Sequence, residues 1–236
     1  EQAARLCAEL GFDGVDINMG CPDRSIEKQG CGSAMIKTPE IAKEVIQAAK
    51  QGVAKEDDSI PVSVKTRIGY NEDEIESWIP NILEEKPAAL TVHLRTRAQM
   101  SKEPAQWEKL AQIVELRDQI SPETVVIGNG DVLSAEDGRL KVMNSGADGA
   151  MVGRALFGNP WFFHPYRKLP TRLIALPTHG VNRDTIIEED ISDGTVEYVT
   201  LDERLSVMVE HTKLFVELLP FKNFSVMKKH YKAYVN

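Results

Sequence analysis

The chain has 236 residues, of which 42% are apolar and three are cysteines, and its formal net charge is −8. No apolar run is long enough to cross a bilayer, and three cysteines do not form the disulfide set of a small secreted domain, so we expect a soluble cytoplasmic enzyme. The net charge argues against loose, charge-driven binding of nucleic acid, but a local basic surface on the chain is compatible with a nucleic acid partner.

The first informative element is a short strand that leads to a cysteine. It follows an opening helix over residues 2–10, and its residues 15–18 alternate between apolar and polar side chains, which is the period of a strand. Gly20 and Pro22 end it. Cys21 therefore lies at the carboxyl end of a strand, where enzymes carry reactive thiols, although a structural cysteine is the commoner reading of a single thiol.

Four more apolar segments follow, and each ends in polar residues: 61–67, 89–95, 124–131 and 149–154. Because side chains alternate along a strand, Lys65 and Arg67 share one face of the first of these, and His93 shares one face of the next with Arg95. The other two end in glycine-rich turns. A structural ion-pair set for Lys65 and Arg67, and a core position for His93, are the alternatives to a role in chemistry.

Helical patterns lie between these strands. Residues 39–51 carry apolar side chains at helical spacing, and Ser134 can cap a helix that runs toward Asn144, with Asp137 in the capping-box position. Alternating strands and helices predict a parallel sheet, either doubly wound or a (β/α) barrel. Since every strand end carries polar groups, we expect a TIM-type barrel, whose strand ends meet at one mouth, with a phosphate site at the last two turns.

The C-terminal third has a different pattern. We expect the barrel part to end near residue 168 and residues 169–200 to be a linker or insertion, because periodicity is lost there. Helical spacing returns at Leu201 and is broken by Pro220. From Lys222 onward the chain is basic and aromatic, which suits an RNA backbone, although a solvated helix face over an aromatic core is an equally common reading.

Six motifs together make the chain resemble the tRNA-dihydrouridine synthases, flavoproteins with a barrel of the old yellow enzyme type. They are DINMGCP at 16–22, GSA at 32–34, VKTR at 64–67, VHLRTR at 92–97, GNGD at 128–131, and GRA through GNPW at 153–161. The resemblance covers most of residues 1–163. It continues at residues 227–230, Met-Lys-Lys-His, where the family's helical domain has an Arg-Lys-His signature and this chain has lysine in place of the arginine.

The resemblance implies that reduced FMN passes a hydride to C6 of a uracil in tRNA, that an acid protonates C5, and that NADPH restores the flavin. A thiol has an ordinary pKa of about 8.5 and is mostly protonated near pH 7, so Cys21 suits the role of the acid. The implied FMN-binding residues are Lys65, His93, Asn129, Gly130, Asp131, Gly153 and Arg154. The implied tRNA-binding residues are Asn18, Arg67, Arg95, Arg97, Lys228, Lys229 and His230.

The count of strands leads to an expectation about the extent of the chain. A closed barrel has eight strands and the sequence predicts five, so we expect a fragment: residues 1–168 as a partial FMN-binding barrel and 201–236 as the start of a truncated helical tRNA-binding domain. We expect no metal, since no cysteine or histidine spacing resembles a zinc site. The sequence does not fix the oligomeric state, and we expect a monomer at full length.

Two other functions stay open at this point. One is an FMN barrel dehydrogenase that acts on a free pyrimidine, which would also place an acid or a base beside a flavin. The other is a tRNA-binding module without catalytic activity, built on a decayed barrel. The basic C-terminal helices argue against the first. Protein that stays colourless with FMN but still retards tRNA in a gel would favour the second.

Overall fold

The computed structural model describes residues 1–57, 59–165, 167–169 and 197–235. These residues form two compact units. The sheet unit comprises Glu1–Gly130 and Gly138–Met151, and the helical unit comprises Asp131–Asp137 and the described residues of Val152–Asn236. The predicted linker over 169–200 lies outside the described residues except for 169 and 197–200. The boundary expected near residue 168 therefore stays a prediction.

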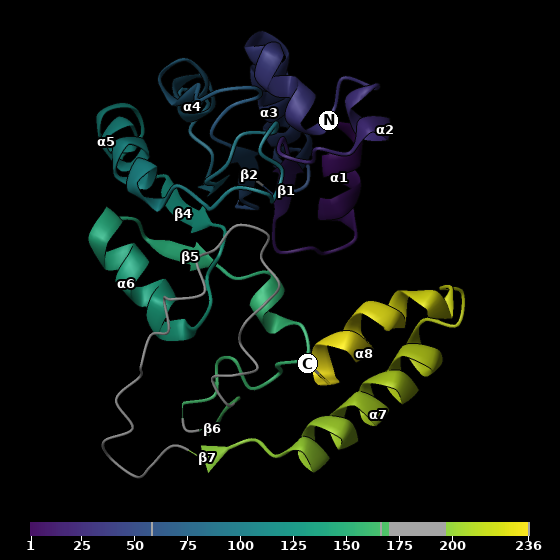
Figure 1. Cartoon of the computed structure of the whole chain (residues 1–236). Coiled ribbons are helices and arrows are strands. Elements are labelled where there is room, and N and C mark those ends of the chain that lie inside the picture. Colours follow the sequence, from purple (N-terminus) through teal and green to yellow (C-terminus); the bar gives the residue numbers. More distant parts are fainter. Residues whose placement is uncertain (58, 166, 170–196, 236) are drawn as a thin grey trace. The chain divides into compact units, whose positions relative to one another are not determined.

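The sheet unit is built on five parallel strands among the residues described: β1 (Val15–Asn18), β2 (Val62–Arg67), β3 (Ala89–His93), β4 (Val125–Asn129) and β5 (Gly149–Met151). All five were predicted. The strands are hydrogen-bonded in the order β1-β2-β3-β4-β5, so each one pairs with its successor in the chain (Figure 1). A doubly wound sheet reverses its strand order at a switch point, whereas a barrel does not, and the observed order is that of a barrel.

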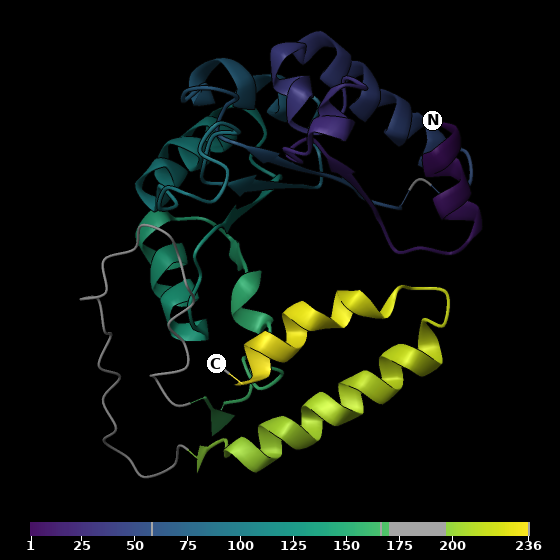
Figure 2. The ribbon, with the colours of Figure 1, turned by 45° about the vertical axis from the view of Figure 1, so that its right-hand side comes forward.

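One face of the sheet is apolar and is covered by helices. Val64, Leu90, Val92 and Val126 are fully buried there against α3 (Pro39–Ala54), α4 (Ile75–Leu83) and α5 (Leu110–Ile120). Figure 2 shows these helices along the outer side of the curved sheet. The residues that alternate with them, Ser63, Lys65, Thr91 and His93 among others, must point to the opposite face, because successive side chains of a strand point in opposite directions. The sheet thus has one core face and one polar face.

The helices of the sheet unit follow from local sequence. In α3, Pro39 occupies the first turn, and the buried side chains of Ala42, Ile46, Ala49 and Val53 recur at helical spacing. α1 (Gln2–Glu9) and α6 (Ala135–Ser145) lie where they were predicted. The Asp137 amide donates to Ser134 Oγ at 3.0 Å, as the predicted cap requires, and the Asp137 carboxylate accepts from the Leu133 amide at 2.9 Å.

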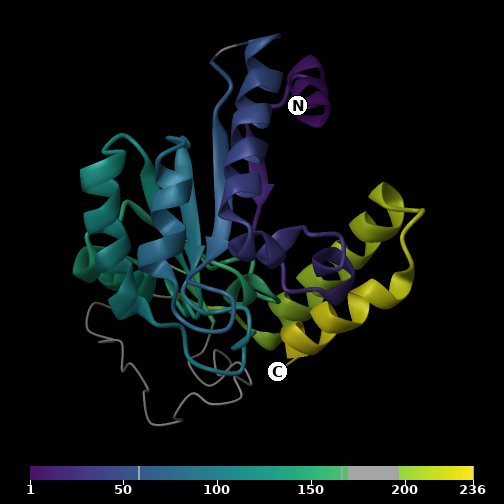
Figure 3. The ribbon, with the colours of Figure 1, turned by 90° about the horizontal axis from the view of Figure 1, so that it is seen from above.

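Two short elements carry the chain from β1 to α3. They are α2 (Arg24–Glu27), capped by the Asp23 side chain, and the 3₁₀ helix η1 (Gly32–Lys37), of which five residues are buried. Figure 3 shows this segment beside the end of the sheet, viewed along a different axis. Hydrogen bonds within this segment, and between it and the ends of the adjacent strands, hold it in place.

The helical unit contains η3 (Arg154–Leu156), the paired short strands β6 (Arg167–Lys168) and β7 (Glu197–Tyr198), α7 (Leu201–Leu218), η5 (Phe224–Met227) and α8 (Lys228–Val235). A capping box between Thr200 and Glu203 begins α7, and the helix ends just before Pro220, as predicted. No helix in the described ranges is both long and apolar enough to span a bilayer.

Candidate active site

The polar face of the sheet gathers five of the predicted site residues at the carboxyl ends of the strands. Asn18 is level with Lys65, and Arg67, His93 and Asn129 form the next level across β2, β3 and β4. Residues paired across neighbouring strands point to the same face, so these side chains share one surface. In a barrel this surface is the interior at the mouth, where TIM-barrel enzymes place their chemistry.

Cys21 follows β1 on a turn whose backbone is held by side chains. The amides of Gly20 and Cys21 both donate to Asn18 Oδ1, each at 3.0 Å. On the other side, Arg67 Nε donates to the Gly20 carbonyl at 2.8 Å and Thr66 Oγ1 donates to the Met19 carbonyl at 3.1 Å. Asn18 was predicted to contact tRNA, and in the structure its side-chain oxygen accepts the hydrogen bonds that shape the thiol's turn.

A second segment of the chain, η1, also holds the backbone of Cys21. Both the amide and the hydroxyl of Ser33 donate to the Cys21 carbonyl, at 3.0 and 2.9 Å. The preceding Gly32 has φ of +62°, and a Cβ on it would lie 2.6 Å from that same carbonyl, so only glycine fits between the two segments. The half-buried Cys21 thiol is thus carried on a turn with little freedom to move.

Arg67 is a buried cation beneath this turn. Besides the Gly20 carbonyl, its guanidinium donates to the carbonyls of Thr96 at 3.1 Å and Met100 at 3.2 Å. Burial lowers the pKa of Arg67 to about 10, with repulsion from Arg95 acting in the same direction and attraction to Cys21 acting against it. Arg67 therefore remains charged at neutral pH, and it links the loops that follow β1 and β3.

Lys65 lies half-buried on the polar face and reaches across β3. Its Nζ donates to Asn129 Oδ1 at 3.0 Å, and Asn129 Nδ2 donates to the Met151 carbonyl at 2.9 Å. Burial lowers the pKa of Lys65 from 10.5, Arg67 lowers it further, and Asp16 opposes the shift. The ammonium group is thus poorly solvated and short of negative partners, which suits a site that receives an electron-rich ligand.

His93 and Arg95 form a second pair at the end of β3. Arg95 is 2% exposed, and its Nε donates to the Glu103 carbonyl at 2.6 Å while its NH1 lies 3.1 Å from His93 Nε2. A guanidinium can only donate, so Nε2 accepts and the ring proton belongs on Nδ1. Gly130 adjoins this pair with φ of +126°, and a Cβ there would lie 3.2 Å from the His93 ring.

Arg97 was predicted to contact tRNA, and in the structure it is engaged by a carboxylate. Its Nε donates to both oxygens of Glu27, at 2.8 and 3.0 Å, and its NH2 forms a further bond to the same group. Whether Arg95 and Arg97 contact RNA stays a prediction. In the structure, Arg95 lies in the interior of the site, and Arg97 contacts the loop that carries Cys21.

The remaining predicted residues belong to the helical unit. Asp131 has φ of +47°, and its side chain accepts a hydrogen bond from Arg154 NH2 at 2.7 Å. A Cβ added to Gly153 would meet no other atom within 4 Å. Lys228 and Lys229 are exposed on α8. His230 packs against the rings of Phe157 and His211, and burial lowers its pKa below 6.5, with His211 and Lys229 adding to the shift. His230 is therefore neutral near pH 7.

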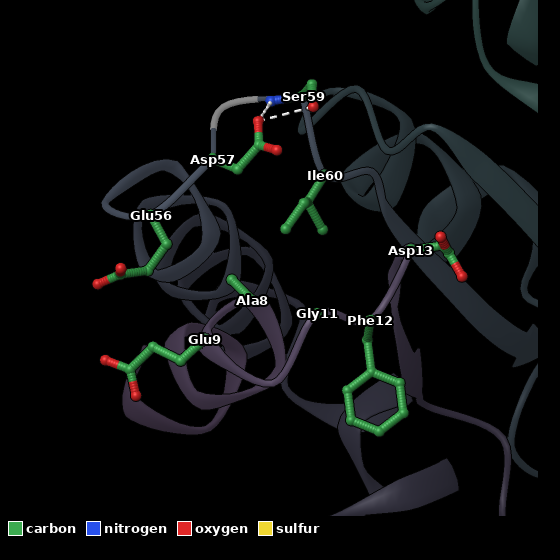
Figure 4. A pocket seen from close by; sticks show the side chains of 9 residues that line it. All are labelled: Ala8, Glu9, Gly11, Phe12, Asp13, Glu56, Asp57, Ser59 and Ile60. Atoms are coloured by element: carbon green, nitrogen blue, oxygen red, sulfur yellow. Dashed lines mark hydrogen bonds between the residues drawn. The ribbon is translucent and has the colours of Figure 1, made fainter.

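A cavity of about 530 Å³ lies at the other end of the sheet. It is lined by residues before β1 and β2: Ala8, Glu9, Gly11, Phe12, Asp13, Glu56, Asp57, Ser59 and Ile60 (Figure 4). None of the predicted site residues lines it.

In the described part of the chain, no group of three or more His, Cys, Asp or Glu side chains has the arrangement of a metal site.

The sequence did not predict a role in the site for three residues: Ser33, Thr66 and Glu27. Ser33 lay inside a motif but had no assigned role, and Glu27 had no signal at all, since its partner Arg97 is 70 residues away. A capping motif or a strand period reports only on neighbouring residues. Contacts between separate strand ends become visible once the sheet register is known.

Comparison with known proteins gives a consistent result. The dihydrouridine synthase (Dus) family model matches residues 1–234. A "Probable tRNA-dihydrouridine synthase 2" of Bacillus subtilis (strain 168) is 47% identical over 157 residues, which are 66% of this chain and 46% of that protein. A "Probable tRNA-dihydrouridine synthase" of Staphylococcus aureus (strain N315) is 45% identical with the same coverage. The chain thus spans about half the length of the curated relatives it matches. A solved 2,3-dimethylmalate lyase aligns with a TM-score of 0.44 and 13% identity over 98% of this chain and 85% of that one, too low a similarity to support an argument.

Proposed function

The chain belongs to the dihydrouridine synthase family, and from this premise we propose that the full-length protein reduces uridines of tRNA to 5,6-dihydrouridine. The observation that carries the proposal is the polar face of the sheet, where Lys65, His93 and the Cys21 turn lie at the ends of three neighbouring strands. The proposed enzyme is a cytoplasmic oxidoreductase, and we expect a monomer at full length.

The donor set at this face fits FMN. The pyrimidine end of a flavin presents carbonyl oxygens and a ring nitrogen, which accept hydrogen bonds and gain negative charge on reduction. The poorly solvated ammonium of Lys65 and the imidazole of His93 are donors suited to such a group. A Cβ at Gly130 would lie 2.7 Å from the Ala105 Cβ and 3.2 Å from the His93 ring, so glycine lets the end of β4 approach His93 closely. We therefore propose that Lys65, His93, Asn129 and Gly130 hold the flavin ring and its chain.

The chemistry then divides between cofactor and protein. When bound, reduced FMN supplies the hydride for C6 of the uracil, and NADPH is the proposed source of that hydride. Cys21 supplies the proton for C5, so that one hydride and one proton together reduce the C5–C6 double bond. The turn that carries the thiol is held through Asn18, Arg67 and Ser33, which fixes where the proton is delivered.

Two further sets of residues complete the proposal. Asp131, Gly153 and Arg154 would hold the FMN phosphate. Arg154 would then exchange its present partner, the Asp131 carboxylate, for the phosphate oxygens. The exposed Lys228 and Lys229 would contact the tRNA backbone. Neutral His230, by contrast, suits a packing or hydrogen-bonding role more than a phosphate contact.

The proposal is tested with the purified full-length protein, unmodified tRNA and NADPH. Replacing Cys21 with alanine should lower dihydrouridine formation by at least about 100-fold, because general acid catalysis contributes about 10²–10⁴-fold, and should leave flavin content unchanged. The matched control is Cys31→Ala, since Cys31 is an exposed thiol in the same segment. Its activity should equal that of the unsubstituted protein.

The result also separates the other two functions. Protein that reduces free uracil or thymine but leaves tRNA unchanged would favour a pyrimidine dehydrogenase. Protein that retards tRNA in a gel but stays colourless after incubation with FMN would favour a binding module without catalysis. If Cys21→Ala loses its flavin, the thiol shapes the pocket and the assignment of the acid is wrong.

A further inference from the structure

Glu27 is a nearly buried carboxylate that none of the roles described so far uses. Its side chain is 9% exposed, and it lies at the end of α2, six residues before Ser33. Arg97 approaches it with a bidentate set of hydrogen bonds from Nε and NH2, and Ser33 Oγ donates to its Oε1 at 2.9 Å. These partners come from two loops that are remote in the sequence.

The contact to Ser33 connects Glu27 with the thiol's turn. The same Ser33 hydroxyl lies 2.9 Å from the Cys21 carbonyl, so its proton is shared between that carbonyl and the Glu27 carboxylate. The chain of contacts therefore runs from the Cys21 carbonyl to Ser33, to Glu27 and to Arg97. A bond to an ionised group is stronger than one between neutral groups, so the carboxylate is the strongest acceptor in this chain of contacts.

The far end of this chain is anchored to a second loop. The Arg97 amide donates to the Gly69 carbonyl at 2.9 Å, and its guanidinium lies over the Tyr70 ring at 5.3 Å. Lys37 of η1 lies over the same ring at 4.2 Å. Hydrogen bonds from Arg97, Ser33 and Tyr70 lower the pKa of Glu27 in spite of its burial, so the carboxylate is ionised at neutral pH.

We propose that Glu27 is a positioning residue for the general acid: its carboxylate joins the loops after β1, β2 and β3 and so fixes the turn that carries Cys21. The proposal rests on the proposed function for its catalytic consequence. Proton delivery to one carbon requires placement of the acid to within about 0.5 Å. Ser33 bonds the Cys21 carbonyl directly, and Glu27 fixes the Ser33 hydroxyl and links it to Arg97. Glu27 itself touches no reacting atom.

The test compares Glu27→Gln with Glu27→Asp in the full-length protein. Glutamine keeps the size but not the charge, so the turnover number with tRNA should fall about tenfold, the KM for tRNA should stay within about twofold, and flavin content should be unchanged. Aspartate keeps the charge for Arg97 and should recover turnover to within about threefold of the unsubstituted protein. The control is Glu84→Gln, which breaks an exposed pair with Lys43 between α3 and α4 and should leave turnover unchanged.

A second readout does not depend on activity. The rate at which iodoacetamide alkylates Cys21, followed by mass spectrometry, should change at least about fivefold in Glu27→Gln, while the exposed Cys31 should change less than about twofold. Unchanged turnover and unchanged Cys21 alkylation in Glu27→Gln would overturn the proposal. Loss of flavin and of thermal stability in both Glu27 variants would overturn it as well, since Glu27 would then hold the fold. If the unsubstituted protein formed no dihydrouridine, the proposed function would fail, and alkylation would still decide on Glu27.

Discussion

At the residue scale, Lys65 shows how one position combines several constraints. The strand period places it on the polar face, the register places it level with Asn18, and its length lets it reach Asn129 across β3. Burial and Arg67 both act against its charge and Asp16 only partly opposes them, so an anionic ligand at this position would stabilise the ammonium. The sequence predicted the face, but not the contact with Asn129, because that contact depends on the strand order.

The lowered pKa of Lys65 predicts how FMN affinity depends on pH. The protonated amine favours an anionic ligand, so affinity should weaken by up to about tenfold per pH unit above the pKa of Lys65 in the free protein. That midpoint lies below 10.5. The measurement is the FMN dissociation constant by fluorescence between pH 7 and 10. In Lys65→Met this part of the pH dependence should be absent, and its persistence would show that another group titrates.

At the element scale, the start of β4 is fixed by a partly buried ion pair. Asp148 Oδ2 accepts from Arg117 NH1 at 2.8 Å and from the Val126 amide at 2.7 Å, while Arg117 also donates to the Thr124 carbonyl. Burial alone would raise the pKa of Asp148, but the Val126 amide and Arg117 together outweigh it, and the pKa lies below 3.8. The pair joins the ends of α5, β4 and β5 and so fixes their register.

This arrangement predicts a loss of stability in Asp148→Asn. Because the Asp148 side chain is 41% exposed, we expect a loss of about 1 kcal/mol at pH 7. A carboxyl group with a lowered folded-state pKa stabilises the protein above its ordinary pKa, and this contribution disappears as the pH falls through the folded value. Urea unfolding should therefore show the full difference at pH 7 and a smaller one as the pH falls below 3.8. Asp118→Asn, which removes the 62% exposed second partner of Arg117, should cost under about 0.5 kcal/mol.

A glycine fixes the docking of α8 within the helical unit. Gly158 has φ of +68°, and a Cβ on it would lie 2.4 Å from the Ala233 carbonyl. Gly158→Ala should therefore push α8 away and speed amide hydrogen exchange over residues 228–235 by about 10–100-fold. Gly149→Ala is the control, because its added Cβ would meet Ile127 at an ordinary 3.8 Å. Equal exchange in the Gly158 variant and the unsubstituted protein would mean that α8 does not dock as described.

The elements divide by how well the sequence predicted them. The five strands, α1, α3, α6 and α7 carry strong local signals, namely period, caps and proline or glycine at their ends, and all were predicted within a few residues. The two short elements after Cys21 were not, because α2 has only four residues and η1 owes its order to buried contacts with other segments. Glu27 was missed for the same reason, since nothing near it in the sequence signals its partner.

At the scale of the whole molecule, strand order and family agree. The described strands pair in sequence order with helices on one face, which is the arrangement of a TIM-type barrel, the fold of the dihydrouridine synthases. The chain spans 46% of the length of its curated relatives, so five strands represent part of such a barrel. The polar face is then an interior surface, which explains why buried cations such as Lys65 and Arg67 lie on it.

The central claim is tested most directly by the dihydrouridine content of cellular tRNA. A strain that lacks the gene is complemented with the full-length gene, either unsubstituted or carrying Cys21→Ala, and tRNA nucleosides are quantified and mapped by mass spectrometry. We predict that deletion removes dihydrouridine from specific positions and that the unsubstituted gene, but not Cys21→Ala, restores it there. Dihydrouridine that is unaffected by the deletion, or fully restored by Cys21→Ala, would contradict the account.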